Sequence, residues 1–151
     1  MLEPKLKDMV TELLVETPLL KDLGLEPNDM HGIVVRATDK LENGRSVEAF
    51  LDFAALVLLD PTSIEFQIGL AEASLAANQP ELALQTAAIV ITEDPSRAEG
   101  FFLSGRACLA IGEPSLAVED LHDAIARAEG KAELTELTRS ARQLLIVAEA
   151  A

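Results

Sequence analysis

The strongest constraint on how this chain folds is a segment that recurs every 34 residues. It reads GRSVEAFLDFAALVLLDP at residues 44–61, NQPELALQTAAIVITEDP at 78–95 and GEPSLAVEDLHDAIARAE at 112–129. Each copy has a turn residue followed by a largely apolar stretch of helical length, and the first two copies end in proline. Such a chain is expected to fold as a stack of similar units, because one unit alone cannot bury its apolar face.

The aligned positions predict that each unit is a helical hairpin, and 34 residues is the period of the tetratricopeptide repeat. Gly44, Asn78 and Gly112 can adopt the left-handed conformation that ends a first helix. Pro61 and Pro95 prevent the second helix from continuing. Small residues, which allow the helices to approach closely, stand at Ala37, Ala71 and Gly105 on the first helix and at Ala49, Ala83 and Ala117 on the second.

The predicted fold is therefore all-α, a tetratricopeptide-repeat array of three helical hairpins with flanking helices at both ends. The hairpins are expected at residues 30–63, 64–97 and 98–131. Their first helices are expected at 30–43, 64–77 and 98–111, and their second helices at 47–60, 81–94 and 115–128.

The two ends of the chain are expected to form flanking helices. Residues 1–29 would hold an N-terminal helix and a linker, and residues 132–151 a helix that caps the stack. Each predicted helix has one apolar face, formed by Leu6, Met9, Val10, Leu13 and Leu14 at one end and by Leu134, Leu137, Ala141, Leu144, Leu145 and Ala148 at the other. A second role of the N-terminal helix, as a homodimer contact, stays open.

The net charge and the hydropathy of the chain argue against nucleic acids and membranes as partners. The net charge of −14 repels phosphate backbones, so nucleic acid is not an expected partner, and it also disfavours anionic membranes. The N-terminus lacks the continuous apolar segment of a signal peptide, and the apolar runs are too short to cross a bilayer. The expected location is the cytoplasm, without membrane insertion.

No pattern of catalysis or metal binding appears in the sequence. The two histidines, His31 and His122, lie in different repeats, and no paired-cysteine, calcium-loop or phosphate-loop motif is present. The single cysteine, Cys108, falls within an apolar helical pattern and is expected to be a buried, reduced thiol. Glu72 and Glu99 could share a groove, but carboxylates alone do not make an acid–base site. The protein is not expected to be an enzyme or to hold a cofactor or metal.

A second apolar stripe predicts a binding surface. In tetratricopeptide stacks the first helices line a concave groove, and here its positions would be the second, fifth, ninth and twelfth of each first helix. The fifth and twelfth are all apolar: Val34, Leu41, Ile68, Leu75, Phe102 and Leu109. The second and ninth are polar and mostly acidic: His31, Thr38, Glu65, Glu72, Glu99 and Arg106. Such a trough would suit an extended or helical peptide, unless the six apolar residues simply widen the core.

The organisation of residues 30–147 resembles that of the class II chaperones of bacterial type III secretion, which hold translocator proteins in the cytoplasm. The resemblance rests on three repeats followed by one trailing helix. It is carried by the segments GRSVEAFLDFAALVLLDP, EFQIGLAEASLA, GEPSLAVEDLHDAIARAE and KAELTELTRSARQLL.

The resemblance implies a groove that binds a short extended segment near the N-terminus of a translocator, with small pockets for apolar side chains. By position it implies contacts at Val34, Thr38, Leu41, Glu65, Ile68, Leu75 and Phe102. Family members tend to have aromatic residues, often tyrosine, where this chain has Val34, Thr38 and Leu41. The resemblance therefore implies a wider first pocket here, or a bulkier anchor on the client.

Two other functions stay open from the sequence. An adaptor that grips the acidic tail of a heat-shock protein needs a basic clamp, and Arg106 is the only cation among the twelve groove positions. A structural subunit of a larger assembly would instead bury the convex face of the array.

Overall fold

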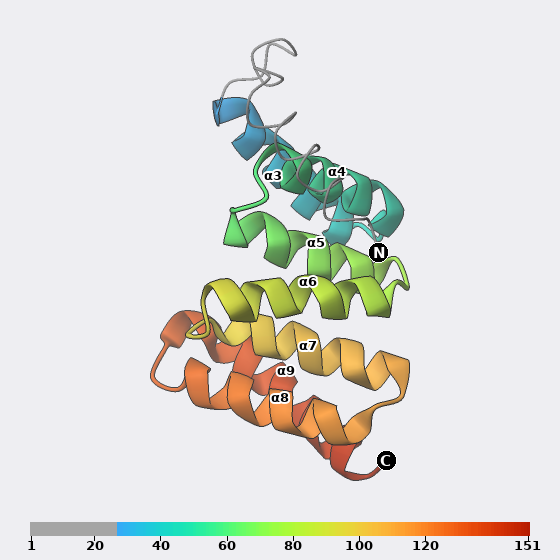
Figure 1. Ribbon diagram of the computed structural model, residues 1–151, viewed down its shortest axis with the longest axis vertical. Helices are drawn as coiled ribbons and strands as arrows, with labels where there is room; N and C mark the ends of the chain where they lie inside the picture. The colour runs from blue at the N-terminus through green and yellow to red at the C-terminus, as the bar shows by residue number, and fades with distance from the viewer. Residues whose placement is uncertain (1–26) are drawn as a thin grey trace, which may run out of the picture.

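The computed structural model describes residues 27–151 as seven α-helices and one short 3-10 turn, with no strand in that range. They are α3 (Pro27–Glu42), α4 (Ser46–Leu59), α5 (Ile64–Ala76), α6 (Pro80–Glu93), α7 (Ala98–Ile111), α8 (Pro114–Ala128), η1 (Ala132–Leu134) and α9 (Thr135–Glu149). From the hairpin of α3 and α4 to α8 the helices follow one another along the long axis of the molecule, and α9 lies at the same end as α7 and α8 (Figure 1). The predicted all-α class is confirmed. The predicted N-terminal helix falls in residues 1–26, outside the described part of the chain.

The hairpin turns form where the repeat predicted them. Gly44, Asn78 and Gly112 have φ angles of 75°, 58° and 93°, so each has the left-handed backbone that glycine and asparagine tolerate best. Pro80 and Pro114 each begin a second helix, where the missing N–H is not needed. The ends of the six repeat helices agree with the predicted ones to within one residue, except that α3 begins at Pro27 rather than at residue 30. The C-terminal helix begins at Thr135 rather than at residue 132, because residues 132–134 form the 3-10 turn η1.

The small residues mark the closest helix contacts. All six predicted positions are buried, from Ala37 on α3 to Ala117 on α8. A further close approach was not predicted: a Cβ atom on Gly69 would lie 2.1 Å from Cε1 of Phe53. The Phe53 ring of α4 therefore packs directly on the backbone of α5.

Three buried clusters run through the stack, one after another. The first contains Phe53 and Leu56, the second Val90 and Leu103, and the third Leu121 together with Ala141 of α9. Because each helix packs mainly on the next helix along the chain, the core is continuous from α3 to α9.

The first helices of the hairpins lie closer together than the second helices. The pairs α3–α5 and α5–α7 make direct contact, whereas in residues 27–151 the pairs α4–α6 and α6–α8 approach one another less. A stack with this asymmetry curves toward its first helices, which places α3, α5 and α7 on the inner side. The last helix, α9, packs on α8 and also contacts α7, as α7 packs on α6 and contacts α5. It therefore takes the place of a fourth first helix.

The apolar face predicted for the C-terminal helix is the face of α9 that packs on the core. Ala141 and Ala148 are buried, and Leu144 and Leu145 pack against the same cluster as Leu121. No helix in the described part of the chain is both long enough and apolar enough to cross a bilayer.

Candidate functional site

The twelve predicted groove positions lie on α3, α5 and α7, and we call them together the first-helix face. Its six apolar members touch the core from one side. Val34 and Leu41 pack on the cluster that contains Phe53, Leu75 packs on that of Val90, and Phe102 and Leu109 pack on that of Leu121. Five of the six are half-buried, and Ile68 is buried with 9% of its surface exposed. These side chains thus contribute to the core, and all except Ile68 keep a substantial apolar surface in contact with water.

An arginine that the sequence analysis did not include joins two members of this face. Arg97, the residue before α7, places Nη2 at 2.9 Å from Oε1 of Glu65 and at 3.0 Å from Oε1 of Glu99. Hydrogen bonding to Glu99 is the main reason that the pKa of Arg97 is raised. The single positive charge of Arg97 therefore offsets half of the negative charge of these two glutamates between α5 and α7. The sequence did contain a signal for this contact. Arg97 comes directly before a predicted first helix, Glu99 follows it by two residues, and Glu65 occupies the position of Glu99 in the preceding repeat.

Glu72 lies in the middle of the face, on the central first helix. Desolvation by the surrounding atoms raises the pKa of its carboxyl group; the positive charge of Arg106 opposes this shift and the negative charge of Glu99 adds to it. The residue nevertheless keeps more than a third of its surface in contact with water. Neighbouring atoms thus partly desolvate the charged form of Glu72 although its side chain still contacts water.

The side chains from α7 add an aromatic and a cation. The guanidinium carbon of Arg106 lies 5.5 Å from the centre of the Phe102 ring, within the range of a cation–π contact. The structure thus brings five predicted members together: Glu65, Glu72, Glu99, Phe102 and Arg106.

The members on α3 stand apart from this cluster. His31 and Thr38 are exposed, and Thr38 Oγ1 donates a 3.0 Å hydrogen bond to the carbonyl oxygen of Val34 on its own helix. Within residues 27–151, no hydrogen bond or ion pair joins the α3 members to those of α5. The α3 end of the face has no acidic member and no arginine, whereas the α7 end has Glu99 and Arg106.

The side chains of this surface are of the kinds that bind peptides. No three His, Cys, Asp or Glu side chains in the described part of the chain are grouped so that they could hold a metal ion. Cys108 is buried and unpaired, as predicted, and desolvation raises the pKa of its thiol. Apolar side chains flanked by charged ones can instead hold the side chains and backbone of a peptide.

Known proteins with this fold are found among solved structures. No protein-family model and no curated protein matches the sequence. A type III secretion complex from Aeromonas hydrophila matches with a TM-score of 0.77 at 24% identity, over 95% of this chain and 96% of the other. The chaperone SycD of Yersinia enterocolitica, crystallised with a peptide of the translocator YopD, matches with a TM-score of 0.73 at 22% identity, over 83% and 95%.

A third match is PcrH, a protein of Pseudomonas aeruginosa, in complex with the chaperone binding region of PopD. Its TM-score is 0.75 at 21% identity, over 84% of this chain and 96% of PcrH. The chain has the fold of the type III secretion translocator chaperones. The predicted resemblance is confirmed for the fold, and the similarity covers nearly the whole of each chaperone.

Proposed function

We propose that this protein is a cytoplasmic chaperone that binds a hydrophobic type III secretion translocator and keeps it soluble. The binding site is the first-helix face, which would hold an extended segment of the client. The observation that carries this proposal is the row of half-buried apolar side chains at equivalent positions of three repeats. It occurs on a fold whose solved members SycD and PcrH are in complex with segments of YopD and PopD.

The energetics suit a segment with a few apolar anchors. Burying one aliphatic side chain of the client contributes roughly 1.5–3 kcal/mol, and ordering a flexible peptide offsets part of that gain. The charged side chains between the apolar rows, Glu72 and Arg106, would align the segment through hydrogen bonds to its backbone or polar residues. Neither an enzymatic activity nor a cofactor is part of this proposal. A homodimer through the N-terminal helix remains part of it.

One observation favours a second candidate, a structural subunit of a larger assembly. The outer face of α4 exposes Val47, Leu51 and Leu58, one above another along the helix. A subunit that buries this face would not need the first-helix face for a peptide. The adaptor for an acidic tail is disfavoured, because Arg97 is already paired and Arg106 is the only cation left on the first-helix face.

The proposal is tested first by Leu75→Asp. A carboxylate at this position meets the apolar anchor of the client, so co-purification with a co-expressed translocator of the same organism should fall by at least about tenfold. Leu75 also packs on the core, so the melting temperature has to be measured on the same preparation. A folded variant that retains the client would remove this part of the face from the binding site.

A second variant avoids the core. Thr38 is exposed, and Thr38→Trp places a large ring on the first-helix face without displacing a buried side chain. Its matched control is Thr92→Trp on α6, because Thr92 is also exposed and also donates to the carbonyl oxygen four residues earlier. Loss of the client with Thr38→Trp but not with Thr92→Trp supports the proposal. Equal retention by both variants, each folded, would contradict it.

A further inference from the structure

The outer side of α9 differs from that of every other first helix. In the hairpins, α3 is covered by α4, α5 by α6 and α7 by α8. Within residues 27–151, no second helix covers this side of α9. In that part of the chain, the place that a second helix would take beside α9 is therefore open.

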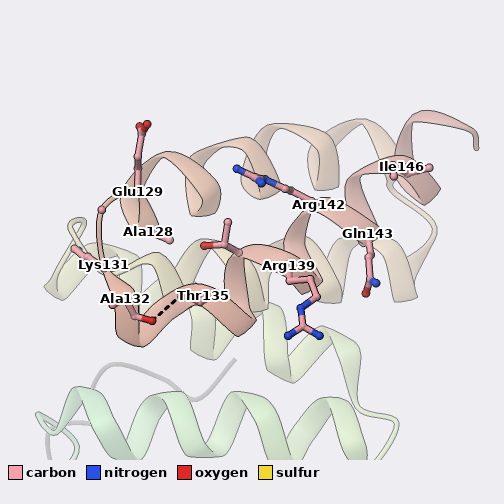
Figure 2. Close-up of a pocket in the computed structure, with 11 residues that line it drawn as sticks. Ala128, Glu129, Lys131, Ala132, Thr135, Arg139, Arg142, Gln143 and Ile146 are labelled. Atoms are coloured by element: carbon pink, nitrogen blue, oxygen red, sulfur yellow. Dashed lines mark hydrogen bonds between the residues drawn. The ribbon is translucent and has the colours of Figure 1, made fainter.

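A hollow of about 680 Å³ lies along this side of α9. Four of its lining residues, Thr135, Arg139, Arg142 and Ile146, follow one another at intervals of three or four and so share one face of the helix. The turn between α8 and η1 closes one end of the hollow, at Lys131 (Figure 2). The second helices that cover the other first helices have 14 or 15 residues, about four turns each.

The charge of this end is unlike that of the rest of the molecule. Residues 127–151 contain four of the twelve Lys and Arg residues and four of the 26 Asp and Glu residues, so this segment is neutral while the rest of the chain has a net charge of −14. Three of the four cations line the hollow, against one carboxylate, that of Glu129. Arg139 pairs with Glu136, whereas Arg142 has no acidic partner among the described residues.

The hollow also has an apolar end. Ile146 is 68% exposed, the highest value among the large apolar residues of residues 29–151, and Val147 next to it is exposed too. A helix that only caps a repeat stack is expected to have a polar outer face. The exposed Ile146 and Val147 depart from that expectation.

From this geometry we propose that the outer face of α9 is a second docking site, which takes an acidic amphipathic helix of another protein in the place that a second helix would occupy. The apolar side of the partner helix covers Ile146, and its carboxylates pair with Arg139, Arg142 and Lys131. The −14 charge elsewhere repels such a helix, which confines it to this end. The site lies on the opposite side of α9 from the core, so it can be filled while a client occupies the first-helix face.

The test uses the full chain and a labelled helical peptide of about 15 residues, the length of α9. The peptide carries Leu along one face and Glu on the other, and an internal cross-link holds it helical, since free peptides of this length are marginal helices. Fluorescence anisotropy should show binding that weakens as salt is added. A peptide with Gln in place of Glu should bind at least about tenfold more weakly.

The variant Arg139→Glu/Arg142→Glu should lose at least about tenfold in affinity for the acidic peptide. Its control, Arg36→Glu/Arg45→Glu, makes the same change in net charge at exposed positions on α3 and the turn after it, and should bind the peptide nearly as the wild type does. Both variants should keep the translocator client. The proposal is overturned if the wild type does not bind the acidic peptide or if the two double variants lose affinity equally. The proposal would also be overturned if the translocator segment displaced the peptide. The same holds if a second copy of this chain, and not the peptide, occupied the outer face of α9.

Discussion

The carbonyl oxygens of Pro61 and Pro95 lie one repeat apart, and each accepts a hydrogen bond from a different kind of side chain. Gln67 Nε2 donates to the first at 3.1 Å, and Arg127 Nε donates to the second at 2.7 Å. Arg127 can reach its carbonyl because its guanidinium stacks on the ring of Phe101, with 3.8 Å between the guanidinium carbon and the ring centre. The proline carbonyl oxygen at this turn thus accepts a side-chain hydrogen bond in both repeats, but the donor is an amide in one and a guanidinium in the other.

At the residue scale, Gly69→Ala should destabilise the array. The added Cβ would lie 2.1 Å from the Phe53 ring, which is itself packed in the core and cannot easily move. Overpacking of this kind typically costs about 1–3 kcal/mol, and urea unfolding would measure it. Gly32→Ala on α3 is the control, because a Cβ there meets nothing within 4 Å and alanine favours helix. Equal stability of the two variants would show that Phe53 can move aside.

Asp120 provides a prediction about pH. Its carboxylate accepts a 2.6 Å hydrogen bond from Ser104 Oγ, yet burial raises its pKa, and the Ser104 bond only partly opposes this. A carboxyl group with a higher pKa in the folded than in the unfolded chain stabilises the fold when protonated, and this stabilisation is lost as the pH rises through the folded pKa. Asp120→Asn keeps an acceptor for Ser104 but cannot ionise. It should therefore melt at a higher temperature than the wild type at pH 7.

The difference between Asp120→Asn and the wild type should disappear at acid pH, below the ordinary pKa of aspartate, where both side chains are neutral. Thermal unfolding across this range checks the prediction. A difference that stays constant with pH would mean that packing, and not ionisation, separates the two proteins.

At the scale of elements, α9 completes the core that α7 and α8 leave open. Ala141 and Ala148 are buried against the cluster of Leu121, and Leu144 and Leu145 cover its edge. The helix supplies no member of the first-helix face. Its stabilising role and the binding of a client are therefore separable.

Removal of residues 132–151 should lower the melting temperature and promote aggregation, because the apolar surface around Leu121 becomes exposed. The shortened protein should still bind the translocator at temperatures where it is folded. Co-purification below the new melting temperature measures this. A shortened protein that melts as before but loses its client would assign α9 to the binding site instead.

At the scale of the whole molecule, the excess of negative charge opposes the compact state. The chain has 26 acidic residues against 12 basic ones, so only a minority of carboxylates can find a cation. Local ion pairs, such as Lys40 with Asp52 at 2.5 Å, do not remove this long-range repulsion.

Added salt should therefore stabilise the protein. Raising sodium chloride from low concentration to about 0.5 M shortens the Debye length to a few ångströms and screens the repulsion, so the melting temperature should rise. A scan at constant pH measures it. The opposite trend would show that the short ion pairs outweigh the net charge.

Local and periodic signals in the sequence were sufficient to determine the architecture. The 34-residue period and the turn residues predicted the all-α class and nearly every helix end, because caps, prolines and left-handed turns act within a few residues of themselves. The same period placed the predicted first-helix face on α3, α5 and α7. Whether those residues bind a client is still a prediction.

Only the tertiary structure decided which distant side chains meet. Arg97 reaches Glu65 from 32 residues away, Phe53 rests on Gly69, and the hollow lies beside α9 where no helix of residues 27–151 covers it. These contacts depend on the angle between successive hairpins and on the side-chain rotamers. Both are set by the packing of the whole stack, so no single segment of the sequence determines them.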